Sequence, residues 1–150
     1  KTMKKIFLEL LVGACMFLAL LSACESKYHI HLVNSLASKN LLVTRCASKD
    51  DSLGIHVIKN GEEFQFMFVQ NFFSTTLFWC DFYKDGNRTA ASGKVFWRSN
   101  HLQKYCQYDP KNGGGDCYWI ATEDGIFLKD RSVDPNRMIF YYSWKGATRV

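Results

Sequence analysis

The chain has 150 residues and a net charge of +5, with 47% hydrophobic and 15% aromatic residues. A chain of this length favours a single domain with one core. The positive charge is modest, and no run of Lys and Arg marks one face. We therefore expect no binding of nucleic acids through their phosphates.

Residues 1–24 have the layout of a secretory signal peptide. A basic start precedes an apolar run over residues 6–21, and small residues follow that run. We expect cleavage after Cys24, export to the extracellular space and no stable membrane insertion of the exported chain. The apolar run contains Glu9 and is shorter than the roughly 20 residues that cross a bilayer, which disfavours a membrane anchor. Lipid attachment at Cys24 is a second alternative.

Four cysteines follow residue 24, and an even number in an exported domain predicts two disulfides. No two of them have the C-x-x-C spacing of a zinc site. Three pairings can form, and we favour Cys46–Cys117 with Cys80–Cys106. The triplet Asn87-Arg88-Thr89 lies in an expected turn and predicts N-glycosylation of Asn87.

The residues after 24 have the pattern of short strands separated by turns. The clearest strand is 62–69, in which Phe64, Phe66 and Phe68 alternate with Glu63, Gln65 and Met67, as in a sheet with one buried face. Asn60-Gly61 and Glu123-Asp124-Gly125 predict two β-hairpins. Further strands are expected at 29–33, 41–46, 54–59, 75–83, 93–98, 105–108, 117–122, 126–129 and 138–144.

About eight short strands of this kind predict an all-β fold. We expect an antiparallel β-sandwich of two sheets with an Ig-like layout over residues 25–150, without a substantial helix. The glycine-rich stretch 112–116 is expected to be irregular, because glycine loses the most conformational freedom in regular structure. The aromatic residues are expected to fill the core.

The order of several motifs resembles the plant self-incompatibility protein family, the S-protein homologues. Departures from the family pattern are Gln70, where Pro is usual, and Ser74, where Gly is usual. The matching motifs are NSL at 34–36, LLVTRCASKDDSLGIHV at 41–57, GEEFQFMF at 61–68, NFFSTTLFWCDF at 71–82, KYC at 104–106 and CYWIATEDGIFL at 117–128.

This resemblance implies a small β-sandwich secreted into the plant extracellular space. The best-known members of the family are stigma-secreted ligands of a pollen membrane receptor. The resemblance therefore implies a non-catalytic protein ligand that binds a cell-surface transmembrane receptor in pollen–pistil or developmental signalling. We expect no cofactor, and we expect a monomer.

Asp50 and Asp51 form the sharpest polar feature of the sequence. The first expectation is that an aspartate side chain accepts backbone N–H bonds and fixes the loop, and the second is contact with a partner. Catalysis would need a second acid opposite, for which Glu62-Glu63 is the candidate, and a calcium site would need spaced oxygen ligands that are missing here.

His29 and His31 lie on one face of a predicted strand. Their spacing is compatible with a shared metal ion, but a site needs three or four ligands. The sequence places neither a cysteine nor an acid where it would complete the set. We therefore expect no metal site.

Recognition is expected in loops at the ends of the rigid sandwich. The longest polar connection is 99–116, and a second loop at 84–92 would be shielded by a glycan on Asn87. The candidate partner-binding residues are Asp50, Asp51, His101, Lys104, Gln107, Asp109, Lys111, Asn112 and Asp116.

The aromatic content also admits a different function, a secreted carbohydrate-binding or cell-wall-modifying protein. This alternative predicts a solvent-facing row of Trp or Tyr side chains flanked by acids. The exposure of Trp79, Trp97 and Trp119 separates the two functions. Burial of all three rings would remove the sugar platform.

Overall fold

The computed structural model describes residues 2–22, 26–37, 40–71, 75–84, 86, 89–106, 108–109, 111, 113–134 and 136–146. Within these residues, no helix combines the length and the apolar character that a membrane crossing requires. The elements are α1 (Thr2–Ser22), β1 (Lys27–Asn34), β2 (Leu42–Ser48), β3 (Ser52–Ile58), β4 (Glu63–Val69), β5 (Phe78–Lys84), β6 (Thr89–Phe96), α2 (Asn100–Tyr105), β7 (Tyr108–Asp109), β8 (Gly114–Thr122), β9 (Gly125–Lys129), β10 (Met138–Tyr142) and β11 (Lys145–Gly146).

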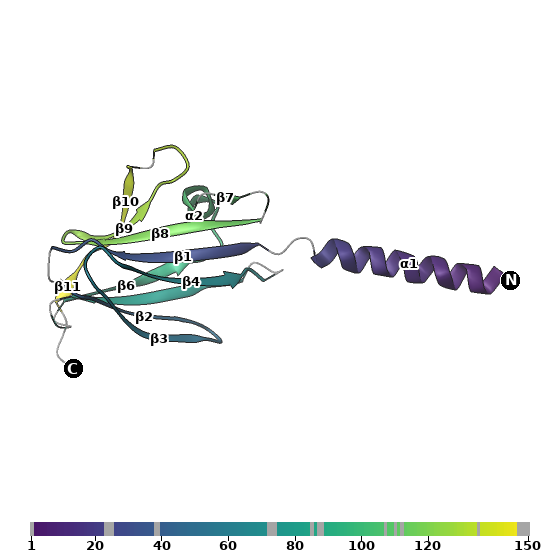
Figure 1. Cartoon of the computed structure of the whole chain (residues 1–150), viewed down its shortest axis with the longest axis horizontal. Coiled ribbons are helices and arrows are strands. Elements are labelled where there is room, and N and C mark those ends of the chain that lie inside the picture. Colours follow the sequence, from purple (N-terminus) through teal and green to yellow (C-terminus); the bar gives the residue numbers. More distant parts are fainter. Residues whose placement is uncertain are drawn as a thin grey trace.

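The strands form two sheets that pack face to face, while α1 extends away from them (Figure 1). One sheet has the order β10-β9-β8-β1-β4, with β7 paired to β8, and the other has the order β11-β6-β5-β2-β3. The predicted all-β sandwich is confirmed. The predicted cleavage point after Cys24 lies outside the described residues, so the signal peptide stays a prediction.

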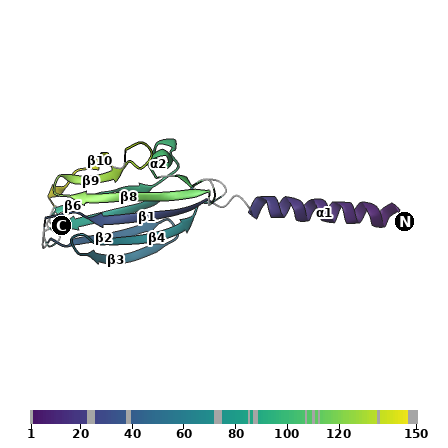
Figure 2. The same ribbon diagram turned by 45° about the horizontal axis from the view of Figure 1, so that its top comes forward.

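One strand pair differs from the predicted antiparallel arrangement. β1 pairs with β4 antiparallel but with β8 parallel, in a register that runs from Tyr28 opposite Gly115 to Asn34 opposite Ala121. Figure 2 shows β1 and β8 side by side along most of their length. A parallel neighbour needs a long connection and leaves no turn motif in the sequence, so local patterns could not reveal it.

The turn at Asn60-Gly61 exists, but the predicted hairpin around it does not. β3 pairs with β2 and β4 pairs with β1, so the turn carries the chain from the edge of one sheet to the edge of the other. Gly61 has φ +78°, and its N–H donates to the carbonyl oxygen of Asn34 at 2.8 Å. The turn is thus bonded to the end of β1.

The second predicted hairpin is confirmed. β8 and β9 pair antiparallel up to Thr122 opposite Gly125, with Glu123 and Asp124 as the two turn residues. The side chains of β4 also alternate as predicted. Phe64, Phe66 and Phe68 pack against the core, whereas Glu63, Gln65 and Met67 are exposed.

The core lies between the sheets and is rich in aromatic rings. Tyr28, Phe82, Phe96 and Trp119 are at most 2% exposed, and Tyr28 and Phe96 have ring centroids 4.7 Å apart. Each fully buried large side chain contributes about 1.5–3 kcal/mol. The aromatic content of the sequence is therefore used largely for packing.

Both predicted disulfides form, but the favoured pairing is wrong. The bonds are Cys46–Cys80 and Cys106–Cys117. Cys46 and Cys80 are directly opposite on the paired strands β2 and β5, with Cα atoms 4.1 Å apart. Cys106 caps α2 and faces β8, which carries Cys117.

The described residues of the segment 105–116 are more regular than predicted. Tyr105 ends α2 instead of starting a strand, and β8 begins at Gly114 inside the glycine-rich stretch. A Cβ atom on Gly114 would lie 1.5 Å from the carbonyl oxygen of Lys27. Glycine is needed here because the backbone of β1 passes too close for any side chain.

Candidate functional site

The two turns predicted to contact a partner lie at the same end of the sandwich, the end from which α1 leaves (Figure 1). β1 and β8 begin at this end, and the 48–51 turn joins β2 to β3 there. We call residues 48–51 and 99–116 together the α1 end. Lys84 and Thr89, both within the predicted second loop at 84–92, are paired at the opposite end of β5 and β6.

The 48–51 turn is fixed by Ser48 and not, as expected, by the aspartates. The Ser48 N–H donates to the carbonyl oxygen of Asp51 at 2.8 Å. The Ser48 hydroxyl oxygen accepts from the N–H groups of Asp50 at 3.3 Å and Asp51 at 3.0 Å. Both aspartates are exposed, which leaves their carboxylates available to a partner.

Asp50 and Asp51 cannot form a catalytic acid pair with Glu62 and Glu63. The turn that carries the aspartates precedes β3, and the glutamates follow it. A strand of seven residues spans roughly 20 Å at about 3.3 Å per residue. The two pairs of acids therefore lie at opposite ends of the sandwich.

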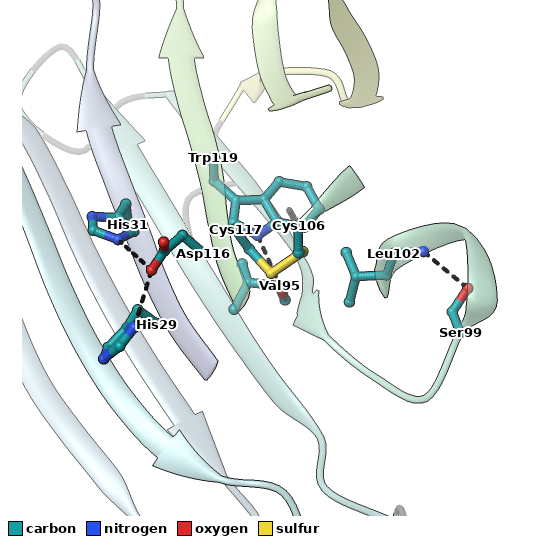
Figure 3. Close-up of a disulfide and its surroundings, with 9 residues drawn as sticks. All are labelled: His29, His31, Val95, Ser99, Leu102, Cys106, Asp116, Cys117 and Trp119. Atoms are coloured by element: carbon teal, nitrogen blue, oxygen red, sulfur yellow. Dashed lines mark hydrogen bonds and ion pairs between the residues drawn. A yellow bond between two sulfur atoms is a disulfide. The ribbon is translucent and has the colours of Figure 1, made fainter. Parts of the chain in front are cut away.

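The short helix α2 holds the next group of candidates in place. Ser99 caps its start, its hydroxyl oxygen accepting from the Leu102 N–H at 3.4 Å, and the side chain of Leu102 is fully buried. Cys106 follows the helix and is bonded to Cys117 of β8 (Figure 3). The disulfide thus anchors the segment that carries Lys104, and Lys104 itself is exposed.

Asp109 and Lys111 lie on the connection from α2 to β8. A carboxylate oxygen of Asp109 accepts from the Lys111 N–H at 2.9 Å, while Lys111 is exposed. Gln107, Asn112 and the predicted glycan site Asn87 lie outside the described residues, and the side chain of His101 is not described either.

Asp116 belongs to a polar network that the sequence analysis missed. His29 Nδ1 lies 3.0 Å from Asp116 Oδ1, and His31 Nε2 lies 3.7 Å from the same oxygen (Figure 3). On its other side, His31 Nδ1 lies 3.1 Å from Glu63 Oε1. The two neighbours of β1 supply the acids that the sequence analysis did not find, Asp116 from β8 and Glu63 from β4.

This network ties three strands together on the outer face of the sheet. The ring of His31 stacks on Tyr118 at 4.1 Å, and the guanidinium of Arg131 lies 4.7 Å from the centroid of Tyr118. In the described part of the chain, no group of three or more His, Cys, Asp or Glu side chains is arranged to hold a metal ion.

A buried acid, Asp130, follows directly after β9. Asp130 Oδ1 accepts from the Ser132 hydroxyl at 2.7 Å and from the Ser132 N–H at 2.9 Å. These bonds, led by the hydroxyl, lower the pKa of Asp130 below its usual range. The Arg131 N–H donates to the carbonyl oxygen of Tyr105 at 3.3 Å, which ties the chain after β9 to α2.

The motif order seen in the sequence is matched by a family comparison. The model of the plant self-incompatibility protein S1 family covers residues 29–144, which is most of the chain. The chain belongs to this family.

Several relatives from Arabidopsis thaliana align over most of their length. S-protein homolog 17 is 33% identical over 123 residues, which are 79% of this chain and 85% of that protein. S-protein homolog 21 is 33% identical over 125 residues, 81% of this chain and 86% of that protein. S-protein homolog 32 is 41% identical over 101 residues, which are 67% of this chain and 66% of that protein.

A solved structure supports the fold independently. It is a self-incompatibility protein homologue, described as one of a widespread family of small, highly stable, secreted proteins from plants. It superposes with a TM-score of 0.59 at 15% identity and covers 81% of this chain and 97% of its own. At that identity the likeness establishes the β-sandwich.

Proposed function

We propose that the chain is a secreted, non-catalytic protein ligand that binds a cell-surface transmembrane receptor through the α1 end, in cell–cell signalling of the pollen–pistil or developmental kind. Family membership and the secreted character of the structural relative support export. The mechanism is docking of exposed side chains on a receptor, which shifts the receptor between conformations.

The observation that carries this proposal is the anchoring of exposed charged residues at the α1 end. Lys104 and Lys111 are exposed, and the disulfide Cys106–Cys117 holds the segment that bears them. A segment that is ordered before binding loses less conformational entropy when a partner docks. Such a surface suits recognition, which needs fixed positions and accessible polar groups.

The alternative carbohydrate-binding function has less support. Trp119 is 1% exposed, and Trp97 is half-buried with its ring 6.1 Å from that of Tyr141. Trp79 is 37% exposed, so the three rings are not all buried and the exposure test alone does not remove the sugar platform. Its cross-strand neighbours are Ala47 and Lys94, however, and neither is an acid.

Binding of the fluorescently labelled secreted protein to intact plant protoplasts tests the proposal. We expect saturable binding that falls about tenfold or more in a K104Q/K111Q double variant, because these lysines face the receptor. The matched control is K59Q/K145Q, which removes the same charge from exposed lysines at the opposite end.

The control variant is expected to bind as the unsubstituted protein does. Absence of saturable binding by the unsubstituted protein, or an equal loss in both double variants, would contradict receptor docking through the α1 end. Purified variants are compared by circular dichroism beforehand so that only folded protein is measured.

A further inference from the structure

A groove of about 480 Å³ opens beside the 48–51 turn at the α1 end. One wall is this turn, with Lys49, Asp50 and Asp51, and the other wall is formed by Asn71 and residues 75–77. The groove is in the size range of small binding sites on proteins, about 300–1,000 Å³. Its lining combines charge at the lip with apolar side chains at the floor.

The carboxylates of Asp50 and Asp51 have no partner among the residues that the structure describes. Among the described residues, neither carboxylate forms a hydrogen bond or an ion pair, since the bonds to Ser48 use only main-chain groups of the two aspartates. The turn would keep its internal bonds if both carboxylates were neutral. They are therefore free to serve something outside the chain.

The opposite wall is held by Asn71. Its N–H donates to Thr76 Oγ1 at 3.0 Å, and its side-chain amide donates to Thr75 Oγ1 at 2.7 Å. The Thr75 N–H donates back to Asn71 Oδ1 at 2.8 Å. These three bonds fix the wall before anything binds, which reduces the entropy lost on binding.

The floor is apolar and partly open to solvent. Phe78 is 6% exposed and packs against Phe68, with ring centroids 4.7 Å apart. Leu77 is half-buried beside them, and Val69, also in the lining, is 42% exposed. An apolar group laid on this floor would cover surface that the fold leaves wet.

We propose that this groove binds a basic–apolar segment of the partner, in which a Lys or Arg side chain pairs with Asp50 and Asp51 and an adjacent apolar side chain covers Val69, Leu77 and Phe68. The inference rests on the proposed receptor-binding function and names the chemistry of one of its contacts. A peptide segment of a protein partner is the occupant.

The sign of the charge selects this occupant. The lip carries two carboxylates against one ammonium, that of Lys49, on a chain whose net charge is +5. An acidic spot on a basic protein attracts a cationic side chain of a partner and disfavours an acidic one. Exposed ion pairs are individually weak, so the two carboxylates and the apolar floor supply the affinity together, and the aspartates also supply selectivity and association rate.

Immobilised synthetic peptides test the inference directly, with the secreted protein in solution. The probe is acetyl-Gly-Arg-Phe-Gly-amide, compared with the citrulline-Phe peptide, which has the same shape without the charge, and with the Arg-Ser peptide, which lacks the apolar group. We expect the Arg-Phe peptide to bind at least about tenfold more tightly than either. Equal binding of all three would overturn the inference.

Four variants locate the contact on the protein. D50N/D51N is expected to reduce Arg-Phe binding about tenfold, and V69S severalfold, whereas K49Q should strengthen it by removing the like charge. D124N is the control, because Asp124 is also an exposed turn aspartate and lies at the opposite end. Equal losses in D124N and D50N/D51N, or weaker binding by K49Q, would overturn the assignment.

A failure of this inference is distinguishable from a failure of receptor binding. Suppose that the unsubstituted protein binds protoplasts saturably and that D50N/D51N binds with the same association rate and the same salt dependence. The groove is then not the contact, although the ligand function stands. If binding falls in D50N/D51N and in K104Q/K111Q but not in D124N, both proposals are supported. Circular dichroism of each variant ensures that misfolded protein is not scored.

Discussion

The indole Nε1 of Trp119 donates a 2.9 Å hydrogen bond to the main-chain carbonyl oxygen of Val95 (Figure 3). Trp119 lies in β8 and Val95 in β6, so this bond joins the two sheets through the core. Both side chains are at most 1% exposed. The carbonyl therefore has no water to replace its partner if the indole is removed.

We expect Trp119→Phe to lower the free energy of unfolding by about 2–4 kcal/mol, because it removes the bond, leaves a buried carbonyl unpaired and opens a cavity. Trp79→Phe is the control, since Trp79 is 37% exposed, and should cost less than about 0.5 kcal/mol. Urea unfolding followed by tyrosine and tryptophan fluorescence measures both. Equal costs would show that the inter-sheet bond contributes nothing.

The two disulfides should differ in their contribution to stability. In the chain-entropy description, the 34-residue loop closed by Cys46–Cys80 contributes about 4 kcal/mol and the 11-residue loop closed by Cys106–Cys117 about 3 kcal/mol. Paired Cys→Ala variants followed by thermal unfolding measure these values. Non-reducing peptide mapping tests the pairing itself, and a Cys46–Cys117 peptide would contradict the structure.

Removal of Cys106–Cys117 should also loosen α2 selectively. We expect faster amide hydrogen exchange over residues 100–106 and little change in β2 and β5, because the disulfide anchors only that helix to β8. Exchange measured by mass spectrometry on the paired Cys→Ala variant provides the comparison. Uniformly faster exchange would mean that the bond acts on the whole fold.

Glu123 should make stability depend on acid. Lys84 donates a 2.8 Å hydrogen bond to it, and this bond, with one from the Ala37 N–H, holds the pKa of Glu123 below its usual value. A lowered carboxylate pKa stabilises the fold above the ordinary Glu value of about 4.3, and the contribution is lost as pH falls through the lowered pKa. Unfolding by urea at neutral pH and at about pH 3 brackets this window.

We therefore expect Glu123→Gln to cost about 1–2 kcal/mol at neutral pH, a value reduced from that of a buried pair because Glu123 is 46% exposed. The cost arises because Lys84, which is 8% exposed, loses its charged partner. The difference from the unsubstituted protein should shrink in acid. Glu62→Gln, an exposed glutamate outside this pair, is the control, and an equal pH dependence in that variant would contradict the assignment.

Gly114→Ala should disrupt the start of β8. The added Cβ would lie 1.5 Å from the Lys27 carbonyl oxygen, and backbone cannot move aside as a flexible side chain can. We expect a loss of more than about 3 kcal/mol. Gly61→Ala, whose Cβ meets nothing within 4 Å but whose φ is +78°, should cost only about 1–2 kcal/mol. The loss of stability in each variant, measured by thermal unfolding, separates the steric clash at Gly114 from the conformational penalty at Gly61.

The sequence predicted the features that depend on neighbours along the chain. The alternation of Phe64, Phe66 and Phe68 identified β4 and its buried face, and Glu123-Asp124-Gly125 identified the β8–β9 hairpin. In both cases the signal and the structure span fewer than ten residues. The resemblance to known motifs predicted the β-sandwich and the family, which these local patterns alone could not identify.

The sequence could not predict features that depend on distant partners. The favoured cysteine pairing was wrong because the correct bond, Cys46–Cys80, follows only from knowing that β2 lies beside β5. Asp116 and Glu63 were missed as neighbours of His31 for the same reason, since the sheet brings them together from separate strands. The role expected of the aspartates, accepting the N–H bonds of the turn, belongs to Ser48, because the motif does not say which oxygen accepts these bonds.

The parallel pairing of β1 with β8 also constrains how the molecule is made. His29 and Asp116 are 87 residues apart, so β1 leaves the ribosome long before the strand that completes its sheet. Until β8 emerges, one edge of β1 remains without hydrogen bonds, and pairing over such a separation is slow. Completion of this sheet is then a late event in synthesis, and a chain arrested before residue 114 presents an open edge that invites aggregation.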